Sequence, residues 1–256
     1  MAMNRWSREQ LVVAFALYCR TSFGKMHKGN PEIVRVARIV GRTPSSLAMK
    51  LVNFASLDPA ITGTGRKGLG NASAEDRRVR DEFHADWDRL AMESARFAQS
   101  LGDAEAAALA ESRDELTEDF AATDRQAWVE VRTKQAFFRS AVLGSYRSRC
   151  CMSGLAVPAL LVASHIVPWK SDPKNRLNPR NGLCLSALHD RAFDRGLITV
   201  TPKLTIMVSK RLGPGDDESF LAESLLELNG KRLEMPEKFA PERRFLEHHV
   251  ERIFKG

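Results

Sequence analysis

Apolar residues recur at helical spacing in three stretches of the first 60 positions. The first stretch covers residues 6–20 and has Ser7 where a helix N-cap belongs. The second opens at Pro31 and ends at Gly41, because proline suits the first helical turn and glycine suits the residue after the last. The third follows at once, with Pro44 in its first turn. This pattern predicts three short helices around one core.

A longer stretch, residues 74–138, has helical spacing but a different composition. It is rich in Ala, Glu, Asp and Arg, lacks proline and contains a single glycine. We interpret it as a helical connector, in which Trp87 and Phe97 belong to the core rather than to a functional site.

The second half of the chain mixes strand and helix patterns. The apolar run 160–163 is typical of a short strand that carries Ser164 and His165 to its end, before Pro168 stops it. The pattern then predicts a loop, a helix and a further strand, at 178–182, 183–193 and 197–200. A mainly helical first half and a mixed second half together predict an α+β protein.

Length and composition exclude several classes of protein. A chain of 256 residues with 43% hydrophobic and 28% charged residues is ordinary for a globular protein. Its longest apolar stretch, Leu11–Cys19, is far shorter than the roughly 20 residues that span a bilayer, and no signal-peptide cleavage site follows it. We expect a cytoplasmic protein without a membrane partner, whose four cysteines are reduced thiols.

The net charge of +7 is unevenly distributed along the chain. Residues 1–70 hold 11 basic and 3 acidic residues, 71–137 hold 9 and 16, and 138–256 hold 19 and 13. Two basic regions therefore flank an acidic one. A basic excess of this kind is typical of proteins that bind a polyanion, although a solvated basic surface explains it equally well.

The first three predicted helices resemble the helix-turn-helix of Myb-like or homeodomain-like DNA-binding domains. The short turn at Gly41, the preceding helix and Trp6 carry this resemblance. It implies that six residues on the solvent side of the third helix meet phosphates or base edges: Arg42, Ser45, Ser46, Met49, Lys50 and Asn53. The alternative is a small helical bundle with a solvated face.

Gly63, Gly65 and Gly68 have the spacing of a dinucleotide-binding loop, but no apolar strand precedes them. We therefore expect no nucleotide cofactor. Arg66 and Lys67, which lie between these glycines, belong instead to a basic loop that touches a phosphate, or to a plain linker.

Candidate chemistry is concentrated between residues 160 and 198. A histidine at a strand end, an asparagine in the next loop and a His-Asp pair on the following helix suit metal-assisted hydrolysis of a phosphodiester. Neutral imidazole accepts a proton from water near neutral pH, and a divalent cation neutralises charge on phosphate and leaving oxygen. On the predicted helix, His189 or Asp190 lies on the exposed side, and Asp194 shares a face with Asp190.

Three sequence strings in this region resemble the HNH endonuclease family: S-H-I-V-P-W at 164–169, N-P-R-N-G-L at 178–183 and H-D-R-A-F-D-R-G-L-I at 189–198. The resemblance implies a ββα-metal fold in which His165 is the general base and Asn181 braces the loop. It also implies catalytic and metal-binding residues on the helix, with His189, Asp190 and Asp194 as the candidates. Lys170, Arg180, Arg191 and Arg195 surround these strings and could hold DNA phosphates, and Trp169 would pack over the catalytic loop.

One departure of this sequence from the family pattern concerns the residue before the general base. Many members have an acidic residue or histidine immediately before the general base, whereas this chain has Ser164, a weak neutral ligand. Mg²⁺ or Mn²⁺ suits the oxygen-rich ligand set, and an imidazole ligand leaves Ni²⁺ or Zn²⁺ open. We expect no structural zinc, because the region has only Cys150, Cys151 and Cys184 and no C-x-x-C pair.

The sequence thus predicts three regions: a helix-turn-helix-like DNA-binding domain at 1–70, a helical connector at 71–137 and an HNH nuclease domain at 138–256. The predicted function is restriction-type cleavage of double-stranded DNA by a homodimer, with dependence on modified DNA open. Two alternatives remain: a DNA-binding regulator with a vestigial HNH domain, and a repair or toxin nuclease that acts on RNA or structured DNA.

Overall fold

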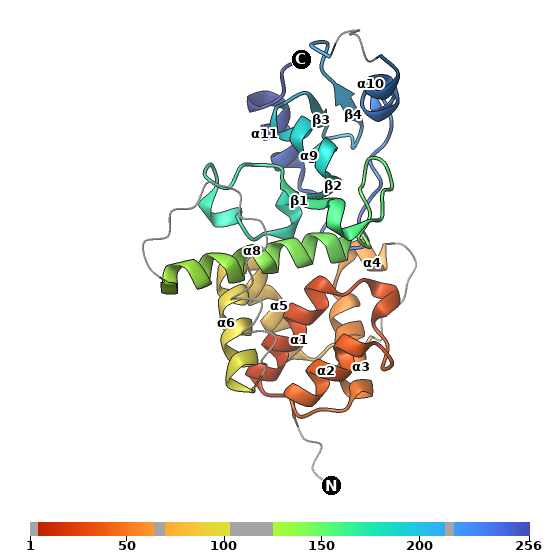
Figure 1. Cartoon of the computed structure of the whole chain (residues 1–256). Helices are drawn as coiled ribbons and strands as arrows, with labels where there is room; N and C mark the ends of the chain where they lie inside the picture. The colour runs from red at the N-terminus through yellow and green to blue at the C-terminus, as the bar shows by residue number, and fades with distance from the viewer. Residues whose placement is uncertain (1–4, 64–69, 103–124, 213–217) are drawn as a thin grey trace. The chain divides into compact units, whose positions relative to one another are not determined.

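The computed structural model describes residues 5–63, 70–102, 125–212 and 218–256 (Figure 1). It divides the chain into two compact units, 1–141 and 142–256. Arg66 and Lys67 fall outside the described residues.

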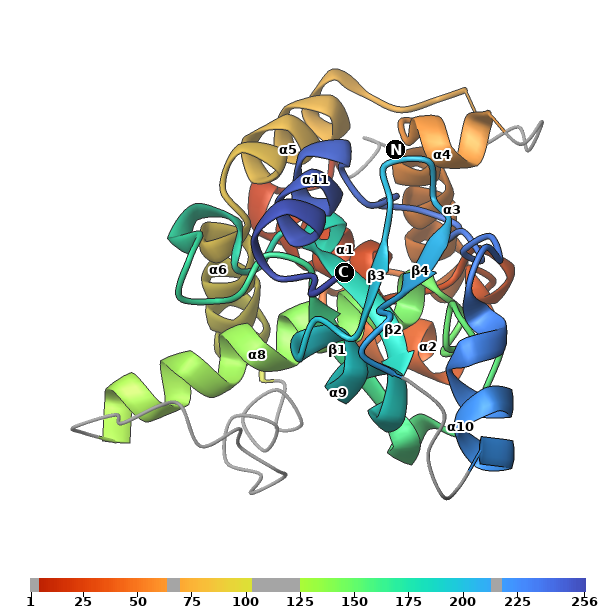
Figure 2. The same cartoon turned by 90° about the horizontal axis from the view of Figure 1, so that it is seen from above.

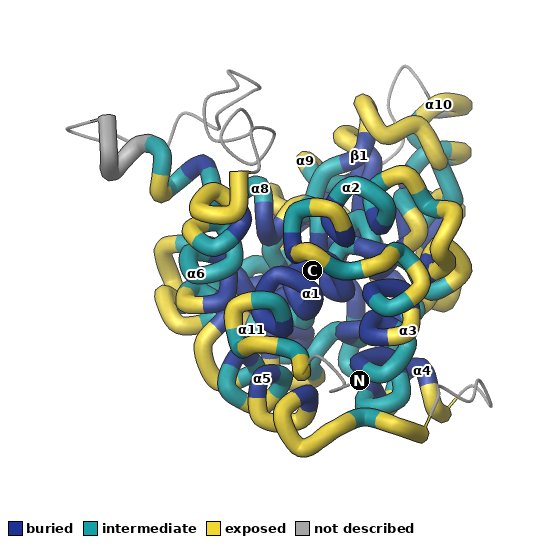
Figure 3. The backbone as a smooth tube through the Cα atoms, turned by 90° about the horizontal axis from the view of Figure 1, so that it is seen from below, coloured by how far each residue is buried: buried dark blue, intermediate teal, exposed yellow. Residues whose placement is uncertain are grey.

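The amino-terminal unit is built around α1 (Arg8–Arg20). Every residue from Leu11 to Cys19 is buried, so this helix is enclosed on all sides (Figure 3). Ser7 and Gln10 form a capping box at its first turn, as the sequence indicated for Ser7. The helices around it are α2 (Pro31–Ile39), α3 (Pro44–Ala55), α4 (Pro59–Thr62), α5 (Ala74–Ala85) and α6 (Trp87–Ser100). A 3₁₀ turn at Phe23–Lys25 separates α1 from α2, and α8 (Arg125–Ser145) crosses the border between the units.

Two of these helices come from the predicted connector. Both α5 and α6 pack against α1, so this stretch contributes directly to the core of the amino-terminal unit. Trp87 is buried there as predicted, in ring contact with Phe15, while Phe97 is only half-buried. Asp86 ends α5 and caps α6.

The prediction that Lys50 faces solvent is wrong. Its ammonium group lies 2.8 Å from one carboxylate oxygen of Asp76 and 3.0 Å from the other, and the side chain of Asp76 is fully buried. Asp76 belongs to the capping box that starts α5, and α5 packs on α3, so the pair is enclosed between two helices. Removing one partner would leave a buried charge without compensation, so Lys50 is committed to the fold.

The carboxy-terminal unit begins its regular structure with two antiparallel strands. β1 (Leu161–His165) pairs with β2 (Gly182–Ser186), so that Leu161 lies opposite Ser186 and His165 opposite Gly182. α9 (Ala187–Asp194) follows directly and packs against both strands (Figure 2). A second antiparallel pair joins β3 (Ile198–Val200) to β4 (Ile206–Val208). The mixture of helices and small antiparallel sheets confirms the predicted α+β class.

The expected helix at 183–193 is wrong in its first third, because residues 182–186 form β2. Leu183, Cys184 and Leu185 are all buried in the pairing with β1. A short apolar run that is buried on both faces lacks the alternation that separates a strand from a helix. The helix starts only where Ser186 supplies an N-cap, by accepting a hydrogen bond from the backbone of His189.

The carboxy-terminal helix, α11 (Arg243–Arg252), and the segment after it pack against α9. The helix before it is α10 (Glu218–Ser224). His249 of α11 stacks on Phe193 of α9 with ring centroids 3.6 Å apart, and its Nδ1 lies 2.8 Å from the hydroxyl of Thr199. Gly196 has a positive φ of 70°, and a Cβ there would lie 2.1 Å from the carbonyl oxygen of Ile253. Glycine is therefore required where the terminal segment crosses the end of α9.

Short 3₁₀ turns complete this unit, at Pro158–Leu160, Pro173–Asn175, Pro179–Asn181 and Leu226–Leu228. All four cysteines are buried free thiols, as expected. Within the described ranges, no helix has both the length and the apolar character needed to cross a bilayer.

Candidate active site

His165 is the last residue of β1, and its ring is held in one orientation. Its Nε2 donates a hydrogen bond to the backbone carbonyl of Arg176, at 2.8 Å. This contact places the ring proton on Nε2 and the lone pair on Nδ1, the tautomer that a general base needs. Burial lowers the pKa of His165 to about 4, although the Arg176 carbonyl opposes the shift. The imidazole is therefore neutral at physiological pH and able to accept a proton.

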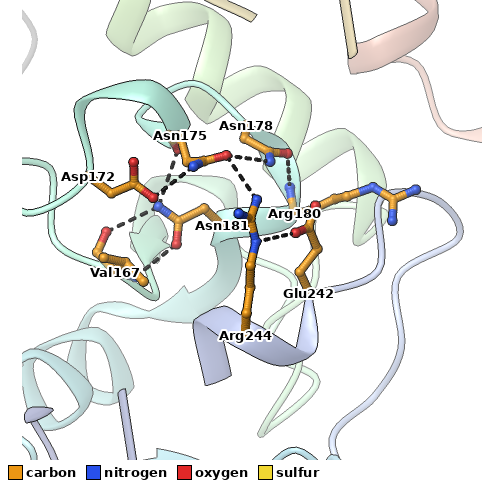
Figure 4. A network of polar contacts seen from close by, with 8 residues as sticks. All are labelled: Val167, Asp172, Asn175, Asn178, Arg180, Asn181, Glu242 and Arg244. Carbon is orange, nitrogen blue, oxygen red and sulfur yellow. Dashed lines mark hydrogen bonds and ion pairs between the residues drawn. The ribbon is translucent and has the colours of Figure 1, made fainter. Parts of the chain in front are cut away.

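Asn181 fixes the chain immediately after His165 (Figure 4). Its Oδ1 accepts a hydrogen bond from the Val167 amide at 2.8 Å, and its Nδ2 donates to the Val167 carbonyl at 3.1 Å. The same Nδ2 lies 3.3 Å from the carbonyl of Asn175, and the backbone carbonyl of Asn181 accepts from the Ile166 amide. Only 1% of Asn181 is exposed. One buried side chain thus joins the two ends of the loop that follows the candidate base.

A wider polar network ties this loop to α11 (Figure 4). Asn175 links to Asp172 and Asn178 through side-chain hydrogen bonds of 2.7 and 3.1 Å. Arg244, in the first turn of α11, reaches Asn175 at 3.4 Å and is held by Glu242 at 2.7 Å. These contacts connect residues about 70 positions apart in the sequence, and the spacing of motifs gave no indication of them.

The candidate metal ligands lie on α9 and at the end of β1. Asp190 is half-buried and next to Ser164, whose hydroxyl oxygen is buried without a hydrogen-bond partner. Burial raises the pKa of Asp190, while Ser164 and Arg191 oppose that shift. Partial burial and the neighbouring charge of Asp190 raise the pKa of Asp194 to about 6. Asp190 thus lies beside Ser164, and its charge raises the pKa of Asp194, an arrangement that a cation relieves.

These side chains suit an oxygen-preferring divalent cation. Among the described residues, no group of three or more His, Cys, Asp or Glu side chains is close enough to enclose a metal. Mg²⁺ and Mn²⁺ do not require such an enclosure, because Mg²⁺ usually takes one or two carboxylates and completes its shell with water and substrate phosphate. Asp190, Asp194 and the orphan hydroxyl of Ser164 match that demand.

His189 does not lie on the exposed side of α9, as one reading of the sequence proposed. Only 4% of it is exposed, and both ring nitrogens are engaged: Nδ1 with Cys150 Sγ at 3.3 Å and Nε2 with the Ser224 carbonyl at 3.1 Å. Burial raises the pKa of Cys150, but the bond to His189 and contacts with Ser153 outweigh it and lower the pKa to about 6. His189 therefore joins α9 to the loop at Cys150 and leaves the candidate metal position to Asp190.

Trp169 and Arg176 lie beside the candidate base. The Trp169 ring meets the His165 ring edge-on, with centroids 5.5 Å apart at 89°, so it packs against the candidate base. Arg176 donates from Nε to the Trp169 carbonyl at 2.8 Å, and its guanidinium lies 5.3 Å from the centre of the ring. Sequence reasoning missed Arg176, because only the folded loop brings it back to Trp169.

The remaining basic candidates of this unit are at its surface. Lys170, Arg191 and Arg195 are exposed and Arg180 is half-buried. Arg180 and Lys170 lie on the loop after β1, whereas Arg191 and Arg195 flank the carboxylates of α9.

The candidates on the third helix are in mixed situations. Ser45 is exposed and Ser46 is half-buried. Arg42 bonds Gln10 and covers the Trp6 ring at 4.9 Å, so part of its function is to hold α1 against the turn. The Oδ1 of Asn53 is buried without a hydrogen-bond partner.

The candidate site thus combines two antiparallel strands, a histidine at the end of the first strand and a carboxylate-bearing helix after the second. Residues 150–201 match the family model of the HNH endonuclease. The carboxy-terminal unit therefore contains an HNH endonuclease domain, and the match includes His165, Asn181, Asp190 and Asp194. α11 lies outside it. No curated protein matches the chain.

Proposed function

We propose that this protein is a metal-dependent endonuclease of restriction type that hydrolyses phosphodiester bonds in double-stranded DNA. The observation that carries the proposal is the state of His165, which is neutral, oriented by the Arg176 carbonyl and placed inside the segment that matches HNH endonucleases. The basic charge of residues 138–256 supports a polyanionic substrate.

The reaction follows from the groups present. His165 Nδ1 accepts a proton from a water molecule, whose oxygen attacks the phosphorus in line with the leaving 3′ oxygen. The bond from phosphorus to that 3′ oxygen breaks, and the oxygen takes a proton from solvent, which yields a 5′ phosphate and a 3′ hydroxyl. Asn181 keeps the imidazole in position by fixing the following loop. Asp190, Asp194 and Ser164 would hold a divalent cation, which supplies charge neutralisation at the phosphate and the leaving oxygen.

The amino-terminal unit would position the DNA. The order α2, short turn and α3, packed on α1, is compatible with a helix-turn-helix reader. We assign the DNA-facing side of α3 to Ser45, Ser46 and Asn53, with Arg42 at the turn, and exclude Lys50 because it is buried. Cutting both strands with one site per chain favours a homodimer.

The test is cleavage of plasmid and phage DNA, unmodified and modified, with Mg²⁺, Mn²⁺ or Ni²⁺ and with EDTA. We expect metal-dependent cuts that carry 5′ phosphates. His165→Ala should lower the cleavage rate by at least about 100-fold and leave DNA affinity nearly unchanged, because a general base contributes roughly 10²–10⁴. The exposed His27→Ala is the matched control and should cut normally. Equal cleavage by His165→Ala would contradict the assignment.

A DNA-binding regulator with a vestigial nuclease domain is the second candidate, and Ser164 favours it. A neutral hydroxyl stands where many family members place a charged or imidazole ligand. DNA binding without cleavage in every metal would support the regulator. Cleavage of RNA or branched DNA in preference to duplex DNA would support the repair or toxin alternative.

A further inference from the structure

The backbone and the side chain of Arg176 make separate contacts near the candidate base. Its backbone carbonyl holds the Nε2 of His165. Its side chain is fixed by the Trp169 carbonyl at Nε and by the face of the Trp169 ring, whose edge meets His165. A long flexible side chain has thus lost most of its freedom close to the candidate base.

The guanidinium of Arg176 has no anionic partner. In the part of the chain that the structure describes, no carboxylate lies within 4 Å of it, and neither terminal nitrogen donates a hydrogen bond. Other arginines of this unit differ: Arg147 pairs with Glu234, and Arg244 with Glu242. A half-buried guanidinium held rigid with its fork of donors unused is suited to bind an oxyanion.

We propose that the terminal nitrogens of Arg176 bind a phosphate of the DNA strand that lies against His165. This inference rests on the proposed function and specifies how the substrate is held. The backbone of Arg176 orients the His165 imidazole, while its side chain holds the phosphodiester. Arg176 therefore sets the position of the phosphodiester relative to the imidazole. Trp169 makes the coupling rigid, because it contacts both the imidazole and the guanidinium.

The salt dependence of DNA affinity tests the contact. Each phosphate neutralised by a protein cation adds about 0.9 to the slope of log K against log salt on duplex DNA. We expect Arg176→Gln to lower that slope by about 0.9, measured by fluorescence anisotropy in EDTA. Arg176→Lys should keep the slope, because it keeps the charge. Single-turnover cleavage at saturating DNA should fall at least about tenfold in both variants, because neither keeps the rigid fork.

Arg252→Ala is the matched loss of one positive charge. Arg252 is exposed in the last turn of α11, far from Trp169 in sequence. It lies outside residues 150–201, which match the HNH family model. Its slope and rate should equal those of the wild type. A normal slope in Arg176→Gln, or an equal fall in Arg252→Ala, would overturn the proposal and leave Arg176 a support for the loop only.

A second measurement needs no variant and so does not depend on how Arg176→Gln folds. Phenylglyoxal modifies arginine side chains, and mass spectrometry locates the modified peptides. Duplex DNA should protect Arg176 and leave Arg252 reactive, whereas equal modification of Arg176 with and without DNA would contradict the proposal. Failure of the wild type to cut any DNA would count against the proposed function, and the slope and the protection would still report on this contact.

Discussion

The two sides of the candidate active site are built in opposite ways. On the side of the base, the two central side chains are hydrogen-bonded: His165 bonds Arg176, and Asn181 bonds the backbone at Val167 and Asn175. On the side of α9, the buried hydroxyl oxygen of Ser164 has no hydrogen-bond partner, and the charge of Asp190 raises the pKa of Asp194. A hydrogen-bonded network whose members all have partners stabilises one geometry. Buried polar groups without partners are instead stabilised when a ligand binds to them.

The difference teaches how the reaction components are divided. The base needs no ligand to reach its working tautomer, so the fold prepares it in advance. The carboxylate side, in the proposed function, would be completed by the divalent cation. α11 supports both sides, through Arg244 at the loop and His249 behind α9, although the HNH match ends at residue 201.

Substitutions on the side of the base should lower the stability of the protein more than substitutions on the side of α9. Asn181→Ala removes three side-chain hydrogen bonds and leaves the buried amide of Val167 without its partner. We expect a loss of about 3 kcal/mol in the free energy of unfolding, since each bond contributes about 1 and an orphaned buried group adds to it. Chemical denaturation measures it.

The exposed Asn71→Ala serves as the control for that substitution and should change stability by less than about 0.5 kcal/mol. Cleavage should fall with Asn181→Ala even at temperatures where the protein is folded. Full activity and stability in this variant would show that the loop does not depend on Asn181, and the comparison would fail.

Acid should weaken the packing of α11 on α9, because this packing involves His249. Burial lowers the pKa of His249 to about 4, below the ordinary value of 6.5, although the Phe193 carbonyl opposes the shift. The unfolded chain therefore binds a proton that the folded chain refuses, so stability is complete above pH 6.5 and is lost as pH falls toward 4. At pH 5 the loss from this residue reaches about 2 kcal/mol.

Thermal unfolding at pH 7 and pH 5 checks this expectation. The decrease in Tm between the two should be smaller in His249→Gln than in the wild type. His165 has a similarly lowered pKa and contributes with the same sign, so some decrease should persist in the variant. An equal decrease in both proteins would mean that His249 is not a source of the acid sensitivity.

The smallest effect is expected at Ser164. Its hydroxyl has no hydrogen bond of normal geometry and only a weak interaction with Asp190, so Ser164→Ala should change the unfolding free energy by less than about 0.5 kcal/mol. The Mg²⁺ concentration that gives half-maximal cleavage should rise modestly, because one oxygen donor is lost. A large loss of stability would place Ser164 among the satisfied groups and remove the asymmetry between the two sides.

Local pattern was sufficient for part of this description. Ser7, Pro31 and Gly41 marked helix ends by their intrinsic preferences, and the apolar run before His165 predicted β1. Motif spacing also selected Asn181, whose contacts are nearly local.

The errors share a physical cause, namely packing between segments far apart in sequence. Lys50 was assigned to the surface by helical periodicity, yet Asp76 of another helix draws it inward. His189 was one of two candidates for the exposed side of α9, yet Cys150 and Ser224 enclose its ring. Arg176 had no motif at all, because its significance depends on how the loop folds back to Trp169.

The most direct test of the division between base and metal sides is Mn²⁺ binding by electron paramagnetic resonance, measured on the wild type, His165→Ala and Asp190→Asn. We expect His165→Ala to bind Mn²⁺ like the wild type and yet not cut DNA, and Asp190→Asn to bind it at least about tenfold more weakly. Equal Mn²⁺ affinity in Asp190→Asn and the wild type, or loss of binding in His165→Ala, would contradict the account.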